Sequence, residues 1–446
     1  MVYSFVRVLD CYVLQQIWLC IPFFILLSSL ALLPSLWPKF WNYYREHWII
    51  GLTLVFAIPF IWMYQDKGIY EIAHTLLLDY FPFIMTISSL YFLACHMVIK
   101  VQASCTPTVN TLFLLLGMIV SSVMGTTGAC AVMIRPFLDL NQNRQLRVHQ
   151  IIFFIFCIAN VGGILSSLGD PPLLLGFLKG VPFMWPTIHL WKAWLGVSTL
   201  LLLCFWVIDN SFYKKEKLIS KMPFSLEIKG KKTIVLLLSL VIGVAALSAA
   251  RWGDLYIPIG EHVLHWPISW MLRDILVVAL FLGVVVKGKT SYRKANHFSW
   301  GVIRELVFIF LGNFVCVIPV GLLLKEGFSG PLEFIQGWLN PGPFQGFAYF
   351  WTTGVLSAFL DNAPAYLLFV ESAGGFSKVS KLLLKAISCG AVFMGAMTYI
   401  GNAPNLLVKE IAEKSGIKMP TFLGYMKWSI LILLPTLLLF SYFLIG

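Results

Sequence analysis

Apolar runs of about 18 or more residues recur along the whole length of this chain. A run of that length is the signal of a transmembrane helix, because about 20 residues of α-helix span the hydrocarbon core of a bilayer. The composition agrees, since 59% of the residues are hydrophobic and only 12% are charged. A soluble domain carries about 25% charged residues. The sequence therefore predicts an all-α polytopic membrane protein.

The net charge of +12 does not predict a nucleic-acid partner, because the basic residues lie between apolar runs. That distribution is typical of positively charged cytoplasmic loops, so the expected partner is the lipid bilayer. The nine cysteines form no CxxC pair and predict buried thiols rather than a metal site. Residues 13–33 are too long and apolar for a signal peptide, and we expect a first transmembrane helix there.

The expected spans follow the same order twice: three helices, a broken stretch, a long broken helix and a plain helix. In the first half they are residues 13–33, 48–63, 74–99, 109–138, 149–178 and 189–208. In the second half they are residues 233–250, 275–286, 302–324, 344–372, 378–411 and 425–445. This order predicts two repeats, in residues 1–210 and 233–446, joined by a basic loop at 211–232.

The residues around the breaks also repeat. The segment 163–172 aligns without gaps on 395–404, with two glycines, a hydroxyl and a proline in common. The matched pairs are Gly163 with Gly395, Ser166 with Thr398, Gly169 with Gly401, and Pro172 with Pro404. The pairing of 125–129 with 361–365 depends on their place in the order rather than on identity.

The charges of the loops predict the orientation of each half. The interval from Asp209 to Lys232 contains seven lysines and is expected in the cytoplasm. If residues 109–138 and 344–372 are re-entrant hairpins, each half crosses the membrane five times. An odd number of crossings inverts the second half relative to the first. The predicted architecture is therefore two inverted repeats of five transmembrane helices, each with a hairpin and a discontinuous helix.

The four breaks are the expected functional site. Irregular backbone at membrane depth is tolerated only where it lines a cavity enclosed by protein, and matched breaks in two repeats indicate a transport site. Asp170 and Asp361 each lie at a break. A charged side chain within a membrane is energetically costly, so we expect these two acids to have a function. Each acid has an alternative interpretation as the cap of a half-helix. Neutral oxygens suited to sodium are available at Thr126, Thr127, Ser166, Ser167, Asn362, Thr398 and Asn402.

The predicted charge is not symmetric, although the scaffold is. Asn402 occupies the position matching Asp170, and Gly125 occupies the position matching Asp361. Two carboxylates in a cavity of low dielectric can exchange protons for a cation, because a nearby positive charge favours their ionised form. We therefore expect sodium ions and protons as transported ligands, with no resident cofactor.

Three segments resemble the NhaD-type sodium/proton antiporters: 168–173 (LGDPPL), 360–364 (LDNAP) and 399–405 (YIGNAPN). These antiporters belong to the ion transporter superfamily, which also contains arsenite permeases and di- and tricarboxylate symporters. The resemblance covers the chain from about His74 to the C-terminus. It implies two inverted repeats, a homodimer with a scaffold and a moving transport domain, and a bacterial inner membrane location. It also implies cation sites at Thr126, Thr127, Asp170, Asn362, Thr398 and Asn402 with Asp361.

Three functions compete. The first is a sodium (or lithium)/proton antiporter working by alternating access. The second is a sodium- or proton-coupled symporter of an organic anion such as citrate or a dicarboxylate. An anion site favours a nearby cation, yet no Lys or Arg lies directly beside a break in the sequence, and two acids do. The third, a membrane-embedded enzyme, has no supporting motif, so we expect no catalytic activity.

Overall fold

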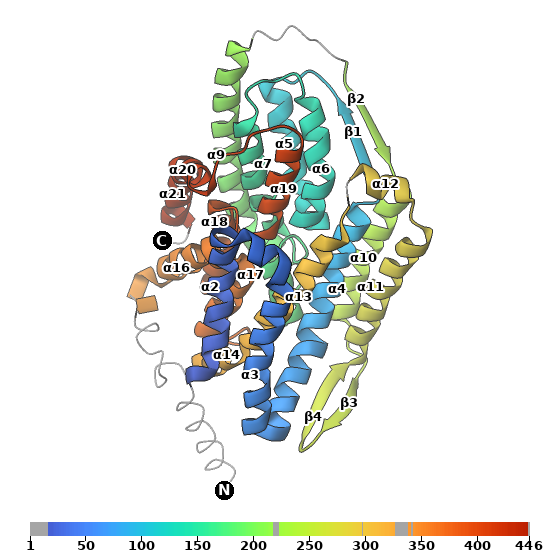
Figure 1. Ribbon diagram of the computed structural model, residues 1–446, viewed down its shortest axis with the longest axis vertical. Helices are drawn as coiled ribbons and strands as arrows, with labels where there is room; N and C mark the ends of the chain where they lie inside the picture. Colours follow the sequence, from blue (N-terminus) through green and yellow to red (C-terminus); the bar gives the residue numbers. More distant parts are fainter. Residues whose placement is uncertain (1–16, 217–222, 297, 326–337, 340–341, 445–446) are drawn as a thin grey trace.

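The computed structural model describes residues 17–216, 223–296, 298–325, 338–339 and 342–444. Within these residues, nine helical segments are long and apolar enough to cross a membrane. The protein is therefore an all-α polytopic membrane protein, as predicted, and its helices form an elongated bundle (Figure 1). Helices suit this solvent because each satisfies its own backbone polar groups, which lipid cannot do.

The N-terminal helices form a hairpin. They are η1 (Ile17–Cys20), α2 (Ile21–Leu36), α3 (Pro38–His74), η2 (Thr75–Tyr80) and α4 (Phe81–Ala94). The chain reverses within α3 at Gln65, where φ is 47°. After the reversal Gly68 lies against the backbone of Phe60, and the helix continues through η2 into α4. Of the first predicted span, residues 13–16 lie outside the described residues.

The rest of the first half contains the first pair of breaks. Its helices are α5 (Pro107–Met124), α6 (Thr126–Leu140), α7 (Val148–Cys157), η3 (Val161–Leu165), α8 (Pro171–Leu178) and α9 (Trp185–Lys215). α5 and α6 meet at Gly125, and the segment between α7 and α8 is irregular apart from the single turn of η3.

The second half follows with helices in a similar order. They begin with α10 (Lys231–Ala249), α11 (Ile268–Lys287), α12 (Thr290–Ala295), α13 (Trp300–Cys316) and α14 (Ile318–Lys325). The breaks lie among η5 (Gly342–Phe344), α16 (Gln345–Leu360), α17 (Asn362–Ser372), α18 (Lys381–Met394), η6 (Gly395–Met397) and α19 (Ala403–Lys414). The chain ends with α20 (Phe422–Trp428), η7 (Ser429–Leu433) and α21 (Leu434–Leu444).

Two pairs of short strands were not predicted. β1 (Val98–Gln102) pairs antiparallel with β2 (Ser225–Lys229), from Val98 opposite Lys229 to Gln102 opposite Ser225. β3 (Asp254–Ile259) pairs antiparallel with β4 (His262–Pro267). The two pairs lie at opposite ends of the bundle (Figure 1).

Several predicted boundaries were wrong. The interval 209–232, expected to be a loop, contains the end of α9, which continues to Lys215, and the strand β2. α11 begins at Ile268 rather than at 275, directly after β4. The span predicted at 74–99 ends as a helix at Ala94, because residues 98–102 pair with β2. Long-range strand pairing is not visible in local hydrophobicity, which explains these errors.

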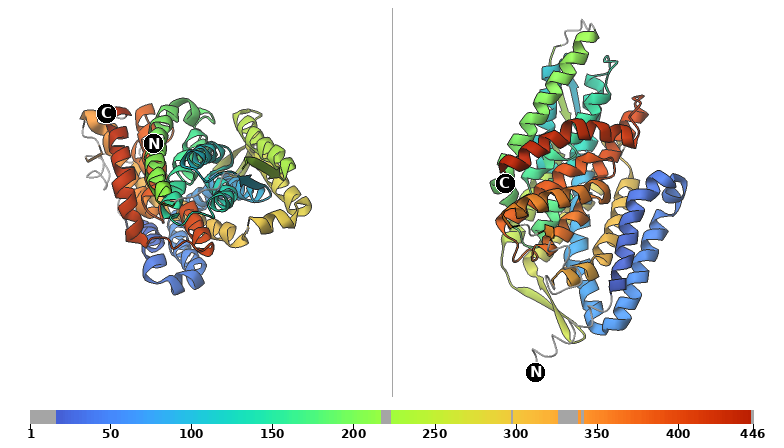
Figure 2. Two further views of the ribbon diagram at one scale, coloured as in Figure 1. Left: turned by 90° about the horizontal axis from the view of Figure 1, so that it is seen from above. Right: turned by 90° about the vertical axis from the view of Figure 1, so that its left-hand side faces the viewer.

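The buried side chains form two main clusters. The larger extends from α4 through α9 and includes α16 to α21. A second cluster joins α2 and α3 to α13 and α14, with fully buried Phe23, Phe56 and Cys316. α2 and α3 therefore pack as a separate layer beside the helices that carry the breaks (Figure 2).

Candidate functional site

The two hairpin breaks have the same backbone conformation. Gly125 has φ 79° and ψ 150°, and Asp361 has φ 74° and ψ 150°. This region is populated almost only by glycine, since a Cβ is strained there by about 1–3 kcal/mol. Asp361 and Gln65 are the two non-glycine residues with positive φ in the described part of the chain. A carboxylate is therefore held at a position where the first half has glycine.

The two long-helix breaks also match. Ser166 (φ −136°, ψ 159°) and Thr398 (φ −134°, ψ 167°) are both extended, and each hydroxyl donates to a carbonyl of the preceding hairpin. Asp170 and Asn402 occupy the same position at the start of α8 and α19. These matches support the predicted internal repeat. The opposite orientation of its two copies stays a prediction.

Glycine is required where each break folds back on itself. A Cβ on Gly169 would lie 2.0 Å from the carbonyl oxygen of Gly163. A Cβ on Gly401 would lie 2.6 Å from the carbonyl oxygen of Gly395. The glycine pairs recognised in the sequence thus allow the two turns to close.

Asp170 is the centre of the site and joins both halves. Its Oδ1 accepts hydrogen bonds from the Thr126 hydroxyl at 2.8 Å and from Asn402 Nδ2 at 3.1 Å. Its Oδ2 accepts from Asn362 Nδ2. The side chain is 2% exposed, and no Lys, Arg or His forms an ion pair with it among the described residues. All four breaks therefore converge on one carboxylate.

Two asparagines extend this network and were missed in the sequence. Asn160 donates to Asn405 Oδ1 at 2.8 Å and accepts from Asn402 at 3.2 Å. Asn405 donates to the backbone carbonyls of Gly395 and Thr398, each at 2.9 Å. Asn405 belongs to the NAPN segment, but Asn160 follows α7 without a motif around it. An asparagine in the middle of the predicted span 149–178 was the available signal, and the structure buries it fully.

The site has free acceptor oxygens. Asn362 and Asn402 are fully buried, and the Oδ1 atom of each has no hydrogen-bond partner in the described part of the chain. A buried acceptor left unpaired is costly, and a sodium ion is bound by such neutral oxygens together with a carboxylate. Asp170, Thr126 and these two amides can therefore supply ligands to a cation.

Asp361 lies next to this network and faces a different environment. Its Oδ1 accepts from the backbone N–H of Asn362 at 2.7 Å. It is partly buried, and like Asp170 it has no ion-pair partner among the described side chains. Both acids are thus ionisable groups without a resident counter-charge.

A cavity of about 780 Å³ reaches the site from one side and is lined by Asp361 and Asn402. Its walls come from α2, α3 and α13 on one side and from α6, α16 and α19 on the other. Two of its cations are paired, Arg45 with Glu305 at 2.8 Å and Lys414 with Glu410 at 3.5 Å. Arg135 lines the same cavity without an ion pair in the described chain, and its Nε has no hydrogen-bond partner.

The remaining predicted residues lie around the centre rather than in it. Thr127 lines a small cavity with Gly125 and Asp170. The hydroxyls of Ser166 and Thr398 donate to the carbonyls of Ser122 and Ala358. Ser167 donates to the carbonyl of Phe183 at 2.8 Å. These three hydroxyls fix the turns, whereas Thr126, Asp170, Asn362 and Asn402 are brought together.

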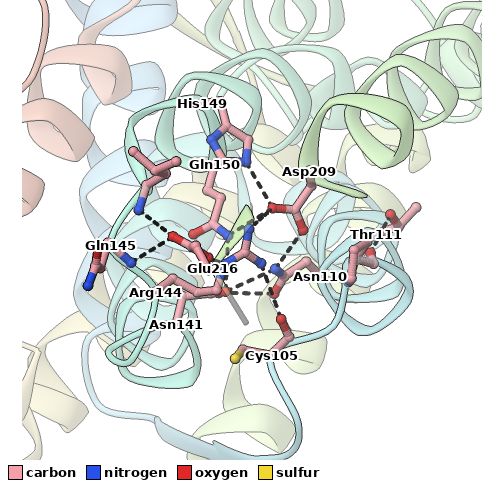
Figure 3. A network of polar contacts seen from close by, with 12 residues as sticks. Cys105, Asn110, Thr111, Asn141, Arg144, Gln145, His149, Gln150, Asp209 and Glu216 are labelled. Carbon is pink, nitrogen blue, oxygen red and sulfur yellow. Dashed lines mark hydrogen bonds and ion pairs between the residues drawn. The ribbon is translucent and has the colours of Figure 1, made fainter. Parts of the chain in front are cut away.

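A second buried polar network was not predicted (Figure 3). Asp209 on α9 accepts hydrogen bonds from Arg144 and His149, each at 2.8 Å. Glu216 accepts from Arg144 Nε and from the backbone N–H groups of the two residues that follow Arg144. Arg144 and Asp209 are almost fully buried. The network ties α9 to α7 and to the α6–α7 connection. No group of three metal-binding side chains occurs in the described residues.

Comparison with known proteins gives one result at the family level. The model of a family described as "Putative citrate transport" matches residues 13–445. No curated protein matches the chain.

Proposed function

The chain belongs to this citrate transport family and is a secondary transporter, and on that premise we propose that it exchanges sodium or lithium ions for protons. The observation that carries the proposal is the carboxylate of Asp170, buried among free amide oxygens with Asp361 beside it. No lysine or arginine neutralises either acid within the described residues. Bound protons or the bound cation then supply the positive charge that balances each carboxylate.

The proposed mechanism is competition for the same oxygens. A bound cation favours the ionised carboxylates and releases their protons, and departure of the cation lets the protons return. Because a charge in a dry cavity is costly, the empty and ionised site is the least populated state. The site then changes its exposure from one side of the membrane to the other with either the cation or protons bound, which couples their opposite fluxes.

The cavity supplies access from one side at a time. It contains Arg45 and Arg135. If the 209–232 interval is cytoplasmic, the five predicted crossings of the first half place both of these residues on the cytoplasmic side as well. We therefore propose that the structure is open to the cytoplasm and closed to the outside. The predicted homodimer is part of the same proposal.

A second function is favoured by two specific observations. The family description concerns citrate, and Arg135, which has no ion pair among the described residues, lines a cavity much larger than a sodium ion. Arginine binds carboxylates through two parallel hydrogen bonds. In that function the Asp170 site binds a cation, and Arg135 binds an organic anion that is carried with it.

One experiment tests both functions. The purified protein is reconstituted into proteoliposomes with an acidic interior, and the pH gradient is followed after sodium, lithium, potassium, citrate or succinate is added outside. Loss of the gradient on addition of sodium or lithium alone supports antiport. A response that requires citrate or succinate, and that Arg135→Gln abolishes, supports symport. If the pH gradient does not change when sodium or lithium is added, with or without citrate or succinate, the proposed exchange is contradicted.

A further inference from the structure

The path beyond the site is closed, and its closure can be followed along α13. Residues of α13 up to Phe310 line the large cavity. One turn later Asn313 and Phe314 line a separate cavity of only about 10 Å³, together with Leu175 of α8 and Leu367 of α17. That volume holds about one water molecule. Largely apolar side chains with one water-sized gap therefore fill the space beyond Phe310.

Asn313 is an unusual member of this group of side chains. It is 4% exposed, and neither its amide nitrogen nor its amide oxygen has a hydrogen-bond partner in the described part of the chain. Leaving both groups of a buried amide unpaired costs several kcal/mol. The water-sized cavity beside it, or a ligand in another conformation, can supply the missing partner. It lines the small cavity together with Ala363 and Pro364, which follow Asp361 by two and three residues.

An ion pair between a partly exposed lysine and a buried aspartate joins the end of α8, whose Leu175 lines the small cavity, to η2. Lys179, the residue after α8, donates to Asp79 Oδ2, and His74 Nδ1 lies 3.9 Å from the same oxygen. Asp79 belongs to η2, a π-helical segment, and its side chain is 7% exposed. π-Helical turns within helices frequently mark functional sites. The adjacent Tyr80 holds this segment to α13 by donating to the carbonyl of Val307 at 2.9 Å.

The pair joins two parts of the protein that the large cavity separates elsewhere. α8 starts at Asp170 in the site and leads away from it to Lys179. η2 and α4 form one helix whose other end, at Tyr91, lines the large cavity. About 12 residues of helix, or about 18 Å, separate Asp79 from Tyr91. The ion pair and the cavity therefore lie at opposite ends of the path.

We propose that the Asp79–Lys179 pair is the second gate of the transport path, closed in this structure, and that Asn313 becomes accessible when it opens. This inference rests on the alternating access of the proposed function. A pair between a buried acid and a partly exposed lysine is strong enough to hold a closed state and weak enough to break in each cycle. The transported ion would then leave past Asn313, with the two charges separated.

The gate is tested with Asn313→Cys in proteoliposomes or right-side-out vesicles. A membrane-impermeant thiol reagent is added from the side of Lys179, and modification at residue 313 is quantified by mass spectrometry. When the Asp79–Lys179 pair is intact, we expect slow modification at residue 313. Lys179→Gln and Asp79→Asn should each accelerate it about two- to fivefold, the effect of losing a partly screened ion pair. The exchanged pair Asp79→Lys with Lys179→Asp should restore slow modification.

Lys192→Gln is the matched control, because Lys192 lies early in α9 and has no ion pair among the described residues. Equal modification rates for Lys179→Gln and Lys192→Gln would overturn the gate, and so would fast modification of the exchanged pair. Sodium-driven proton movement is measured on the same samples. If that movement is absent but modification responds to the pair, the proposed exchange fails and the gate stands. If exchange is intact and modification does not respond, only the gate fails.

Discussion

At the scale of single residues, Asp361 combines two unfavourable features. Its backbone has a conformation suited to glycine, and its carboxylate has no counter-charge in the described chain. The equivalent residue of the first half, Gly125, has the same φ and ψ without either cost. Strain kept at one of two equivalent positions indicates that the side chain is needed there.

Asp361→Gly should therefore stabilise the protein and abolish transport. Relative to Asp361→Ala, which keeps the strained backbone, the glycine variant should be more stable by about 1 kcal/mol. Thermal unfolding of the detergent-solubilised variants gives the comparison, and proteoliposome assays give the activity. Gly125→Ala is the control at the equivalent position of the first half. Its new Cβ would lie 3.3 Å from the carbonyl oxygen of Leu168, and the substitution should destabilise the protein. Retained exchange in Asp361→Gly would remove Asp361 from the mechanism.

Asp170→Asn should keep the fold and lose cation binding. The new amide nitrogen at position 170 would face the Nδ2 donor of Asn362. The Asn362 amide can rotate by 180° so that its free Oδ1 accepts a hydrogen bond from the new amide. The loss of charge should weaken sodium binding at least about tenfold. Calorimetry measures the affinity of both proteins.

The same titrations test the competition with protons. In the wild type, affinity for sodium should fall as the pH is lowered, because protons occupy the carboxylates that the cation needs. Binding should also release fewer protons in Asp170→Asn than in the wild type. Equal affinities and equal proton release in the two proteins would assign Asp170 a purely structural role at the start of α8.

At the scale of elements, the Arg144–Asp209–Glu216 network joins α9 to the connection between α6 and α7 (Figure 3). α7 begins in this network, at His149, and is followed at its other end by Asn160 of the site. The hairpin α5–α6, α7 and α9 are therefore fastened together at one end. We expect them to move as one body.

Breaking this network should destabilise the first half. Arg144→Gln leaves the buried carboxylates of Asp209 and Glu216 without their arginine, which costs about 3–5 kcal/mol. Asp209→Asn should cost less, because Arg144 keeps its ion pair with Glu216. The measurement is a lowered midpoint of thermal unfolding in detergent. Arg147→Gln, next to the network but without an ion pair among the described residues, should have little effect. A midpoint unchanged in Arg144→Gln would show that the network contributes little to holding α9.

The elements were largely predictable, and the contacts between them were not. The four breaks were found because glycine, proline and polar residues interrupt apolar runs, which is a local signal. The meeting of Thr126, Asp170, Asn362 and Asn402 depends on how the two halves pack, and the sequence indicated it only through the repeat. The pairing of Asp209 with Arg144 and the cavity position of Arg135 follow from helix rotation, which hydrophobicity fixes poorly in a protein that is apolar on most faces.

At the scale of the whole molecule, the charge pattern predicts an orientation. A tag inserted between α9 and β2 should be cytoplasmic, whereas tags in the β3–β4 turn at Gly260 or after the C-terminus should be outside. Protease protection in oriented vesicles reads out each tag. If protease added to the outer side cleaves the β3–β4 tag and leaves the α9–β2 tag intact, the result agrees with the prediction. An exposed α9–β2 tag on the outer face would invert the assignment of the cavity.

The strand pair β1–β2 has a consequence for biogenesis. β1 directly precedes α5 and β2 directly follows α9, so this ladder brackets the helices that carry the first half of the site. The ladder cannot form until Lys229 has been synthesised, which is after all the helices of the first half. Until then the nascent chain holds Asp170 in the membrane without Asn362 and Asn402, which are made later. The newly inserted protein therefore passes through a stage with a buried acid and half of its partners, and completion of the second half ends it.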